Sequence, residues 1–387
     1  MQKNNKKKIF YWSPCLNPVG TVNSTLNSLI ANMKYGDDIF DVYLINACGE
    51  WNDYLDFLSR YKVQIINLRL NFFKYLPKQG YLQSRFSYLI IYLMCFFPLL
   101  KVITRNKPDY FIAHLITSLP LTIMNIVKMN TKFILRISGM PKLNYFRKSF
   151  WKSISKKISF VTCPTEELKS KLISMDIFDK NQLYFLPDAI IDIKNFIKKK
   201  NEKIEKFHKY ENKRLIFAAG RLTKQKNFNY LIDEFSLFCE NNNDYNLIVL
   251  GDGEKKTELE KKIKQKNLSN RIFLLGHQKN VYKYFKKGDV FVLSSLWEEV
   301  GFVMVEAALS NLFIIASNCP NGPKEFLNYG KSGLLFKNNS EGQLAESFKD
   351  FINLEDLNDK KLLTKKNVKK YTKFRHFLKL KEILNNH

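Results

Sequence analysis

Short apolar runs alternate with helix-like segments along the whole chain, and no other feature of the sequence restricts the fold as much. The apolar run at 7–12 is followed by a polar, helix-like segment at 21–33 and by a second apolar run at 40–46. A strand, helix, strand order of this kind is typical of a parallel sheet covered by helices. The sequence therefore predicts an α/β fold.

A charged segment divides the chain into two such series. Further strand candidates lie at 63–68, 108–115, 132–138, 158–163 and 182–187 in the first series, and at 215–220, 246–253, 271–276, 290–295, 313–318 and 333–338 in the second. Residues 193–214 between them are poor in large apolar side chains, which is typical of a linker or an exposed helix.

The length of 387 residues exceeds the usual size of one domain. We predict two Rossmann-like domains at 1–190 and 214–370, a basic linker at 191–213, and a final helix at 371–387 that joins the first domain. A ligand is expected in a cleft between two such domains, at the carboxyl ends of the strands.

Two carboxylates stand eight positions apart in the second series. Glu298 follows an apolar run, Gly301 comes next, and Glu306 falls within a helix predicted to begin near Phe302. Backbone amides at the start of a helix attract phosphate groups or sugar hydroxyls. Carboxylates accept hydrogen bonds from vicinal hydroxyls, so ribose and hexose are natural partners.

Cations and glycines follow neighbouring strands of the same series. Arg221 and Lys226 lie in the loop after one strand, where they suit a diphosphate, although a solvated basic loop would look the same. Gly251 and Gly253 end the next strand, where the backbone either turns tightly or approaches a ligand.

These segments resemble the nucleotide-binding domain of retaining GT-B glycosyltransferases of family four, over most of residues 214–336. The matching stretches are GRLTKQKN, VLGDGE, FLLGHQKNVYKYFKKGDVFVLSSLWEEVGFVMVEAALSN and SNCPNGPKEFLNYGKSGLLF. The resemblance implies a GT-B fold, in which two Rossmann-like domains face each other across a cleft.

The resemblance also assigns roles to residues of the second series. It implies that Glu306 binds the ribose hydroxyls, that Glu298 binds the donor sugar, and that Arg221 and Lys226 bind the diphosphate. The backbone amides of Val300, Gly301 and Phe302 would approach the sugar and the phosphate. Glu325 would lie near the nucleotide, with a structural salt bridge as the alternative.

The donor loop departs from the family pattern at two positions. Glu299 stands where the family usually has glycine, and Val300 stands where it usually has an aromatic residue. The shape of this loop near the sugar therefore leaves the identity of the donor open.

The same resemblance extends to the first series. It implies that Gly20 lets the backbone approach the acceptor or the donor phosphate. His114, at the end of a strand, would line the cleft near the transferred sugar, with a structural histidine as the alternative. The next such loop offers Arg136, Ser138 and Gly139.

The sequence lacks the residue spacings that are typical of metal sites. The chain has no Asp-x-Asp pair, its six cysteines form no CxxC pair, and its histidines show no metal spacing; they are His114, His208, His277, His376 and His387. We expect catalysis without a metal and no cofactor besides the nucleotide-sugar substrate. The scattered cysteines indicate buried free thiols in a reducing compartment.

Positive charge dominates the composition. Lys and Arg outnumber Asp and Glu by 63 to 36, which gives a net charge of +27. Such a charge attracts anionic lipids, phosphorylated substrates or nucleic acid, but it also arises from compositional drift. The basic residues are spread over the chain without a nucleic-acid-binding motif, so we expect no nucleic-acid partner.

The segment at 71–107 is basic, aromatic and apolar. Its longest apolar run, Tyr88–Leu100, has 13 residues, fewer than the ~18 to 20 that span a bilayer. The surrounding cations are Lys74, Lys78, Arg85, Lys101, Arg105 and Lys107. Such a helix lies in a membrane interface or is buried in its domain. No secretory signal is expected after the basic start. We predict a cytoplasmic protein that contacts the inner membrane surface.

The predicted function is retaining transfer of a hexose or N-acetylhexosamine from a nucleotide diphosphate sugar, with a UDP-sugar favoured. The acceptor would be a glycan or a lipid-linked glycan of cell-surface polysaccharide or lipopolysaccharide synthesis. Arg221, Lys226, Glu298 and His114 are the predicted catalytic residues. The alternatives are an impaired nucleotide-sugar-binding scaffold, a basic membrane- or polyanion-binding protein, a phosphorylase and an epimerase.

Overall fold

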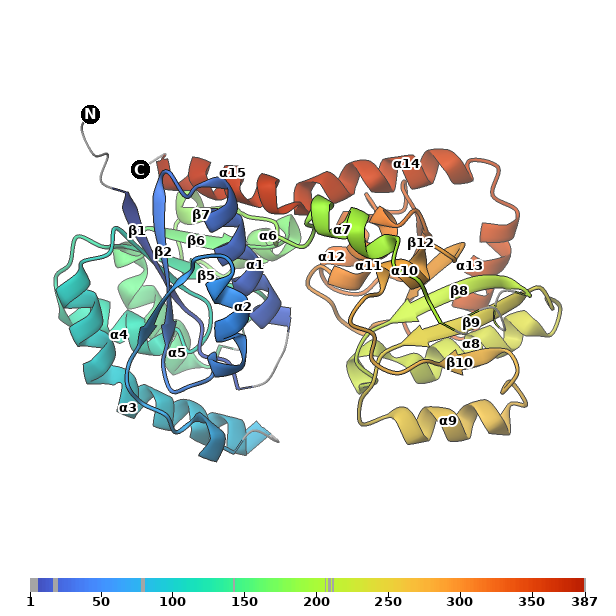
Figure 1. Cartoon of the computed structure of the whole chain (residues 1–387), viewed down its shortest axis with the longest axis horizontal. Coiled ribbons are helices and arrows are strands. Elements are labelled where there is room, and N and C mark those ends of the chain that lie inside the picture. Colours follow the sequence, from blue (N-terminus) through green and yellow to red (C-terminus); the bar gives the residue numbers. More distant parts are fainter. Residues whose placement is uncertain are drawn as a thin grey trace. The chain divides into compact units, whose positions relative to one another are not determined.

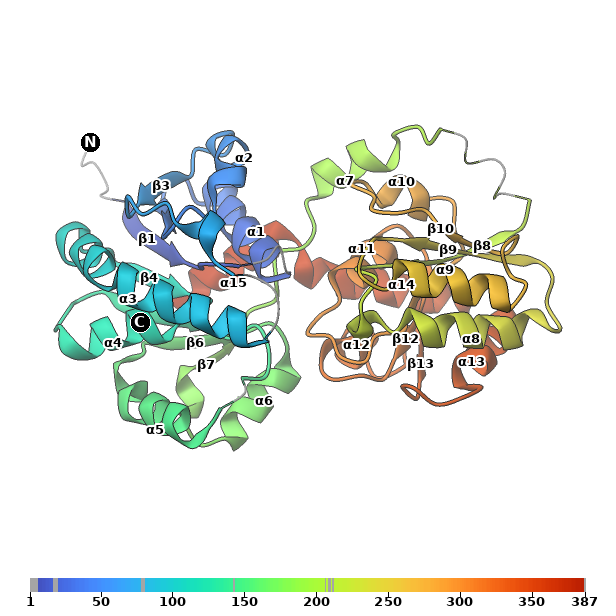
Figure 2. The same cartoon turned by 90° about the horizontal axis from the view of Figure 1, so that it is seen from below.

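The chain folds into two units, each built on a parallel β-sheet (Figures 1 and 2). Unit 1 combines Met1–Ala189 with Lys373–His387, and unit 2 is Ile190–Thr372. The computed structural model describes residues 6–16, 20–77, 81–141, 143–205, 207, 210 and 212–385. Lys78, His208 and His387 from the sequence analysis lie outside these described residues.

Unit 1 contains a sheet of seven strands in the order β3-β2-β1-β4-β5-β6-β7. The strands are β1 (Lys7–Trp12), β2 (Phe40–Asn46), β3 (Gln64–Asn67), β4 (Tyr110–Ala113), β5 (Lys132–Arg136), β6 (Phe160–Cys163) and β7 (Leu183–Phe185). The helices are α1 (Gly20–Tyr35), α2 (Leu55–Ser59), α3 (Tyr81–Asn106), α4 (Ser118–Ile126), α5 (Tyr145–Ile154), α6 (Glu166–Ser174) and α15 (Lys373–Asn385).

Unit 2 contains a sheet of six strands in the order β10-β9-β8-β11-β12-β13. The strands are β8 (Arg214–Ala219), β9 (Tyr245–Leu250), β10 (Ile272–Leu274), β11 (Val290–Leu293), β12 (Phe313–Ser317) and β13 (Leu334–Phe336). The helices are α7 (Ile193–Lys200), α8 (Phe228–Cys239), α9 (Lys256–Gln265), α10 (Tyr282–Phe285), α11 (Phe302–Leu309), α12 (Gly322–Phe326), α13 (Gln343–Ile352) and α14 (Leu357–Val368).

Both sheets are covered on both faces, which is why their strands are continuous apolar runs in the sequence. In β1, Phe10 and Trp12 pack into a core with α3, α4 and α5, while Ile9 and Tyr11 pack into a second core with α1 and α15. In unit 2, α8, α9 and α13 cover one face, and α10, α11 and α14 cover the other. The predicted α/β class and the two Rossmann-like sheets of a GT-B fold are confirmed.

The predicted linker and the final helix each belong to one of the two units. Residues 191–213 belong to unit 2, and α7 within them packs on α10, with the Phe196 and Tyr282 rings 5.1 Å apart. Helix α15 belongs to unit 1, where Tyr110 Oη donates a hydrogen bond to the Leu384 carbonyl (3.0 Å).

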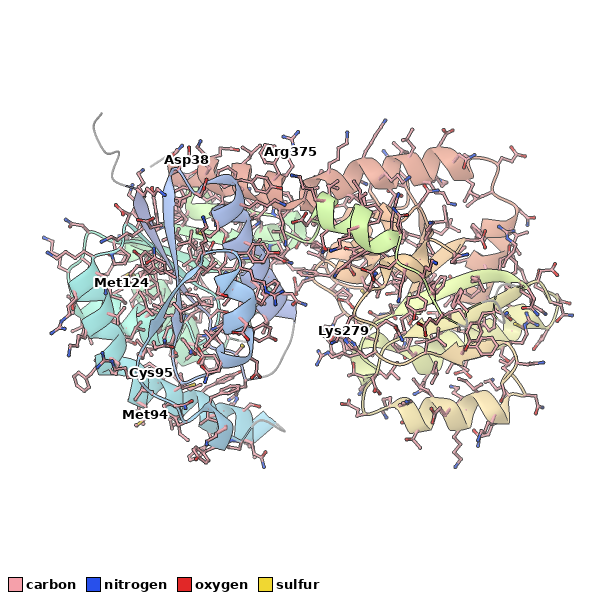
Figure 3. All side chains as sticks on the ribbon, in the orientation of Figure 1. Asp38, Met94, Cys95, Met124, Lys279 and Arg375 are labelled. Carbon is pink, nitrogen blue, oxygen red and sulfur yellow. The ribbon has the colours of Figure 1, made fainter. Side chains whose placement is uncertain are left out.

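Helix α3 is longer than its uninterrupted apolar run indicated. It has 26 residues, and Leu82–Asn106 is long and apolar enough, by length and composition alone, to cross a membrane. The expectation that this segment is too short was wrong, because mean hydropathy tolerates isolated polar residues. Ile91, Cys95 and Leu99 are nevertheless buried in the core of unit 1. Figure 3 labels Cys95, which is fully buried, and its neighbour Met94, which is 52% exposed.

Candidate active site

The strand order of unit 2 reverses between β8 and β11, and the loops after these two strands meet at that point. Such a reversal leaves a crevice at the carboxyl edge of a parallel sheet, which is where α/β proteins bind ligands. The backbone joins the loops, because Leu296 N donates to Gln225 O (2.8 Å) and Ser294 Oγ donates to Lys226 O (2.8 Å). Lys226 and Glu298 are thereby brought together.

An ion pair joins these two loops. Lys226 Nζ contacts Glu298 Oε1, and the two side chains are 15% and 10% exposed. Ser295 Oγ donates a hydrogen bond to the same carboxylate oxygen (2.8 Å). Ser295 was missed in the sequence, because a serine after an apolar run carries no particular signal.

The glycines of the neighbouring loops make room for this arrangement. A Cβ atom on Gly220 would lie 2.9 Å from Cε of Lys226, and one on Gly251 would overlap the carbonyl oxygen of Gly220. A Cβ atom on Gly253 would lie 2.6 Å from the carbonyl oxygen of Leu222. Contact between the two loops therefore explains both predicted glycines without a ligand. Arg221 lies in the first of these loops with an exposed side chain.

Helix α11 starts directly after the loop of Glu298. Gly301 precedes the helix with φ of +79°, a conformation that favours glycine, and no side chain caps the helix start. The first-turn amides of such a helix have no partner within the helix and favour an anion. Val300 is buried in the core beneath the loop, and Phe302 is half-buried.

Glu306 lies one turn into α11. Tyr282 Oη, from α10, donates a hydrogen bond to Glu306 Oε1 (3.2 Å). Burial raises the pKa of Glu306 to about 7, against the opposing effects of the Tyr282 hydrogen bond and the positive charge of Lys199. Tyr282 was also missed, because it reaches the site from a separate helix.

Glu299, which replaces the usual glycine, turns toward a different loop. Asn321 Nδ2 lies 3.1 Å from both carboxylate oxygens of Glu299. The backbones also pair, since Glu298 N donates to Pro320 O (2.7 Å) and Asn321 N donates to Glu298 O (2.5 Å). Helix α12 begins there, and Glu325 lies half-buried in it. Glu299 thus connects the loop between β11 and α11 to the loop after β12.

Unit 1 has the same kind of reversal between β1 and β4, and a cavity of about 720 Å³ opens beside it. His114 directly follows β4, and its backbone N–H donates to Trp12 O (2.9 Å). Gly20 is exposed at the start of α1, and the next residue, Thr21, lines the cavity. The other lining residues include Tyr88, Leu89 and Tyr92 of α3, Phe150 and Trp151 of α5, and Arg136, Ser138 and Gly139.

His114 and Arg136, two predicted site residues that line this cavity, form contacts with other side chains and with the backbone of unit 1. Arg136 Nη2 contacts Asp188 Oδ1 (2.7 Å), with side-chain exposures of 3% and 5%, and Arg136 Nη1 donates to Leu186 O (2.8 Å). His114 Nδ1 lies 3.2 Å from Thr25 Oγ1. Burial and the positive charge of Arg136 hold the pKa of His114 well below its usual range, so its imidazole is neutral at pH 7.

Two arginines lie near each other beside the cavity. The guanidinium of Arg147, on α5, stacks 5.0 Å from the centre of the Trp151 ring. Burial and the positive charge of Arg85, on α3, lower the pKa of Arg147. Residues 57–165, which supply α3 and α5, contain 18 Lys and Arg but a single acidic residue, Asp109. The sequence analysis noted Arg85 and missed Arg147.

A metal-binding cluster is absent from the residues that the structure describes, because no three His, Cys, Asp or Glu side chains gather there.

Comparison with known proteins gives a consistent picture. The family model for glycosyl transferases group 1 matches residues 199–371. An uncharacterized glycosyltransferase of Methanocaldococcus jannaschii is 32% identical over 296 residues, which cover 69% of this chain and 70% of that protein.

A Campylobacter jejuni enzyme is 27% identical over 57% of this chain. It is named N-acetylgalactosamine-N,N'-diacetylbacillosaminyl-diphospho-undecaprenol 4-alpha-N-acetylgalactosaminyltransferase, and the match spans 60% of its length. The crystal structure of Anabaena HepE in complex with UDP superposes with a TM-score of 0.73 at 16% identity, covering 99% of this chain and 100% of that chain.

Proposed function

The chain belongs to the group 1 glycosyl transferases, and we propose that it transfers a hexose or N-acetylhexosamine from a UDP-sugar to a lipid-linked glycan, with retention of anomeric configuration. The observation that carries this proposal is the ion pair of Lys226 and Glu298, which joins two loops at the strand reversal of unit 2, directly before the uncapped start of α11. Glu306 lies one turn into that helix, where it accepts a hydrogen bond from Tyr282.

The donor would be bound by exchange of partners within this ion pair. Without a donor, Lys226 and Glu298 neutralise each other. A nucleotide sugar offers Lys226 a phosphate and offers Glu298 a sugar hydroxyl, so each charge gains a ligand when the pair separates. Glu306 would bind the ribose hydroxyls, and Arg221 would reach the diphosphate from its exposed position. The UDP complex of HepE supports a uridine nucleotide.

The chemical step breaks the bond between the anomeric carbon and the phosphate oxygen. Positive charge develops on the carbon and negative charge on the leaving phosphate. Lys226, Arg221 and the α11 amides would stabilise that phosphate in place of a metal ion, and a fixed donor of this kind contributes about 3 to 4 kcal/mol. The acceptor oxygen forms the new bond on the same face of the sugar, and its proton passes to the leaving phosphate. Configuration is thereby retained.

The acceptor would bind to unit 1. The cavity beside His114 is lined largely by apolar and aromatic side chains, and Arg85 and Arg147 supply positive charge beside it. An apolar chain joined to a diphosphate matches both properties. The Campylobacter relative is named for a diphospho-undecaprenol acceptor, which supports a lipid-linked acceptor in cell-surface glycan synthesis here.

Helix α3 supports a peripheral contact with the inner membrane surface. Leu82, Phe86, Leu93 and Phe97 form one stripe along the helix, and each is more than half exposed. The opposite stripe is in the core of unit 1. A basic helix with such a stripe lies in the headgroup region of an anionic bilayer. If the protein ignores vesicles rich in anionic lipid at low salt, this part of the proposal fails.

The proposal is tested by following UDP release from UDP-hexoses and UDP-N-acetylhexosamines with a polyprenyl-diphosphate-linked sugar as acceptor. We expect release that depends on the acceptor, and a product with the anomeric configuration of the donor. Inverted product would reject retention. Nucleotide binding with neither transfer nor slow donor hydrolysis would identify a nucleotide-sugar-binding scaffold instead.

A further inference from the structure

Two adjacent hollows on unit 2 are lined by lysines that the proposed reaction does not use. Their volumes are about 370 and 330 Å³, and both include Lys200 of α7 and Lys286 beside α10. We name this surface the α7–α10 face and define it by Lys200, Lys203, Lys283, Lys286, Lys287 and Lys365. Among the residues that line the two hollows, Glu202 is the single carboxylate, and it accepts a hydrogen bond from Asn280 Nδ2 (2.8 Å).

Three of these lysines have contacts that leave their positive charge available to a ligand. Lys286 Nζ lies 3.4 Å from the amide oxygen of Asn201, and Lys283 Nζ lies 3.4 Å from the carbonyl oxygen of Lys203. Both partners are neutral. Lys200 Nζ lies over the Phe196 ring, 5.3 Å from its centre, which orients the side chain without neutralising it.

Helix α7 adds an apolar component to the same face. Ile193 and Ile197 stand one turn apart and are 44% and 52% exposed, whereas Phe196 is buried against Tyr282. Lys198, Lys199 and Lys200 follow in the last turn of the helix. Exposed apolar residues beside flexible cationic side chains are the composition of helices that lie in a membrane interface.

We propose that the α7–α10 face binds the phosphate groups of an anionic lipid bilayer, with Ile193 and Ile197 entering the headgroup region. A soluble polyanion would satisfy the lysines equally well but would leave the two isoleucines without a partner. The bilayer explains both the charge and the apolar residues. This inference goes beyond the proposed reaction and does not rest on it. It also concerns a different surface from the proposed membrane contact of α3, because α3 belongs to unit 1 and the α7–α10 face belongs to unit 2.

The first test changes charge at this face and at a matched place elsewhere on unit 2. The full chain carrying K286E and K287E is compared with one carrying K261E and K264E on α9, where both lysines are exposed and the change in net charge is the same. A lysine near an anionic surface contributes ~1 kcal/mol, or about fivefold in partitioning. We expect at least ~25-fold weaker sedimentation with phosphatidylglycerol vesicles for K286E and K287E, and a loss of less than threefold for the α9 variant.

The second test separates a bilayer from a soluble anion. I193S with I197S keeps the charge and replaces two exposed residues, so the fold should be retained, which circular dichroism checks. We expect about tenfold weaker vesicle binding. Equal losses in the two lysine variants would overturn the proposal, because charge alone would then explain binding. Unchanged vesicle binding of the isoleucine variant, together with displacement of vesicles by inorganic polyphosphate, would assign the face to a soluble polyanion.

Discussion

Paired charged side chains lie at the carboxyl edge of both sheets, at the strand reversal in unit 2 and at the end of β5 and after β7 in unit 1. In unit 2 the pair is Lys226 and Glu298, which extends from two loops and keeps some exposure. In unit 1 the pair is Arg136 and Asp188, which is almost fully buried and further held by the Leu186 carbonyl. A pair in loops can exchange its partners for a ligand, whereas a buried pair with backbone hydrogen bonds neutralises its charges within the fold. The two pairs therefore differ in what a ligand could do to them: the loop pair can separate, whereas the buried pair is fixed within the fold.

The largest expected effect is on stability and concerns the buried pair of Arg136 and Asp188. R136A should lower the free energy of unfolding by about 3 to 5 kcal/mol in urea denaturation, because Asp188 is left charged and buried. R136M combined with D188L removes both charges and should recover most of the loss. Full stability of R136A together with lost acceptor turnover would instead make Arg136 a substrate ligand, as the sequence predicted.

On the unit 2 side, K226A should act on the chemical step. We expect kcat to fall by about 10² to 10³, because the leaving phosphate loses a fixed cation. K224A is the matched control, since Lys224 is exposed in the same short turn and should change kcat by less than twofold. Similar losses in both variants would mean that this loop attracts the donor only through its general charge.

Nucleotide binding should depend on pH through Glu306. Its pKa of about 7 means that the protein without nucleotide holds a proton there in mild acid. A ribose diol donates hydrogen bonds and favours the carboxylate, so UDP affinity should rise about tenfold from pH 6 to pH 8. The Tyr282 hydrogen bond lowers this pKa, so Y282F should move the midpoint to higher pH in calorimetric titrations. In E306Q the pH dependence due to Glu306 should disappear, and only the dependence due to titration of the UDP phosphate should remain.

The smallest expected effect concerns the clamp between Glu299 and Asn321. E299A should raise the KM for the donor about fivefold and leave kcat nearly unchanged, because a charged hydrogen bond that positions the donor loop is lost. E299Q should restore the KM, since its amide oxygen still accepts from Asn321. If E299A and N321A have fully additive effects, the two side chains do not act as a pair.

The fold was largely predictable because parallel strands buried on both faces are continuous apolar runs. Every strand of the described residues overlaps a run identified in the sequence, including the short β10 and β13. The length of α3 was misjudged because its ends mix apolar with polar residues. The α/β class follows from the order of strands and helices along the chain. The position of the strand reversals depends on which strands are neighbours in the sheet, which the sequence does not show.

The site was predictable only where residue type and spacing combine. Glu298 and Glu306 are recognisable from their spacing around a glycine, and Lys226 from its loop. Ser295, Tyr282 and Asn321 are common residue types that carry no signal of their own, and Tyr282 and Asn321 reach the site from another helix and another loop, so only the structure relates them to it. The partner of Arg136 could not be predicted either, because Asp188 is 52 positions away in the sequence.

The central claim is that the crevice of unit 2 binds a nucleoside diphosphate, and thermal shift without added metal tests it most directly. The wild-type chain, E306A and the control E346A, altered at an exposed residue of α13, would be compared with UDP, GDP, ADP and CMP and their sugar conjugates. We predict a clear rise in Tm with UDP and UDP-sugars for the wild type and E346A, and a rise reduced or lost in E306A. No shift of the wild-type chain with any of these nucleotides would contradict the account.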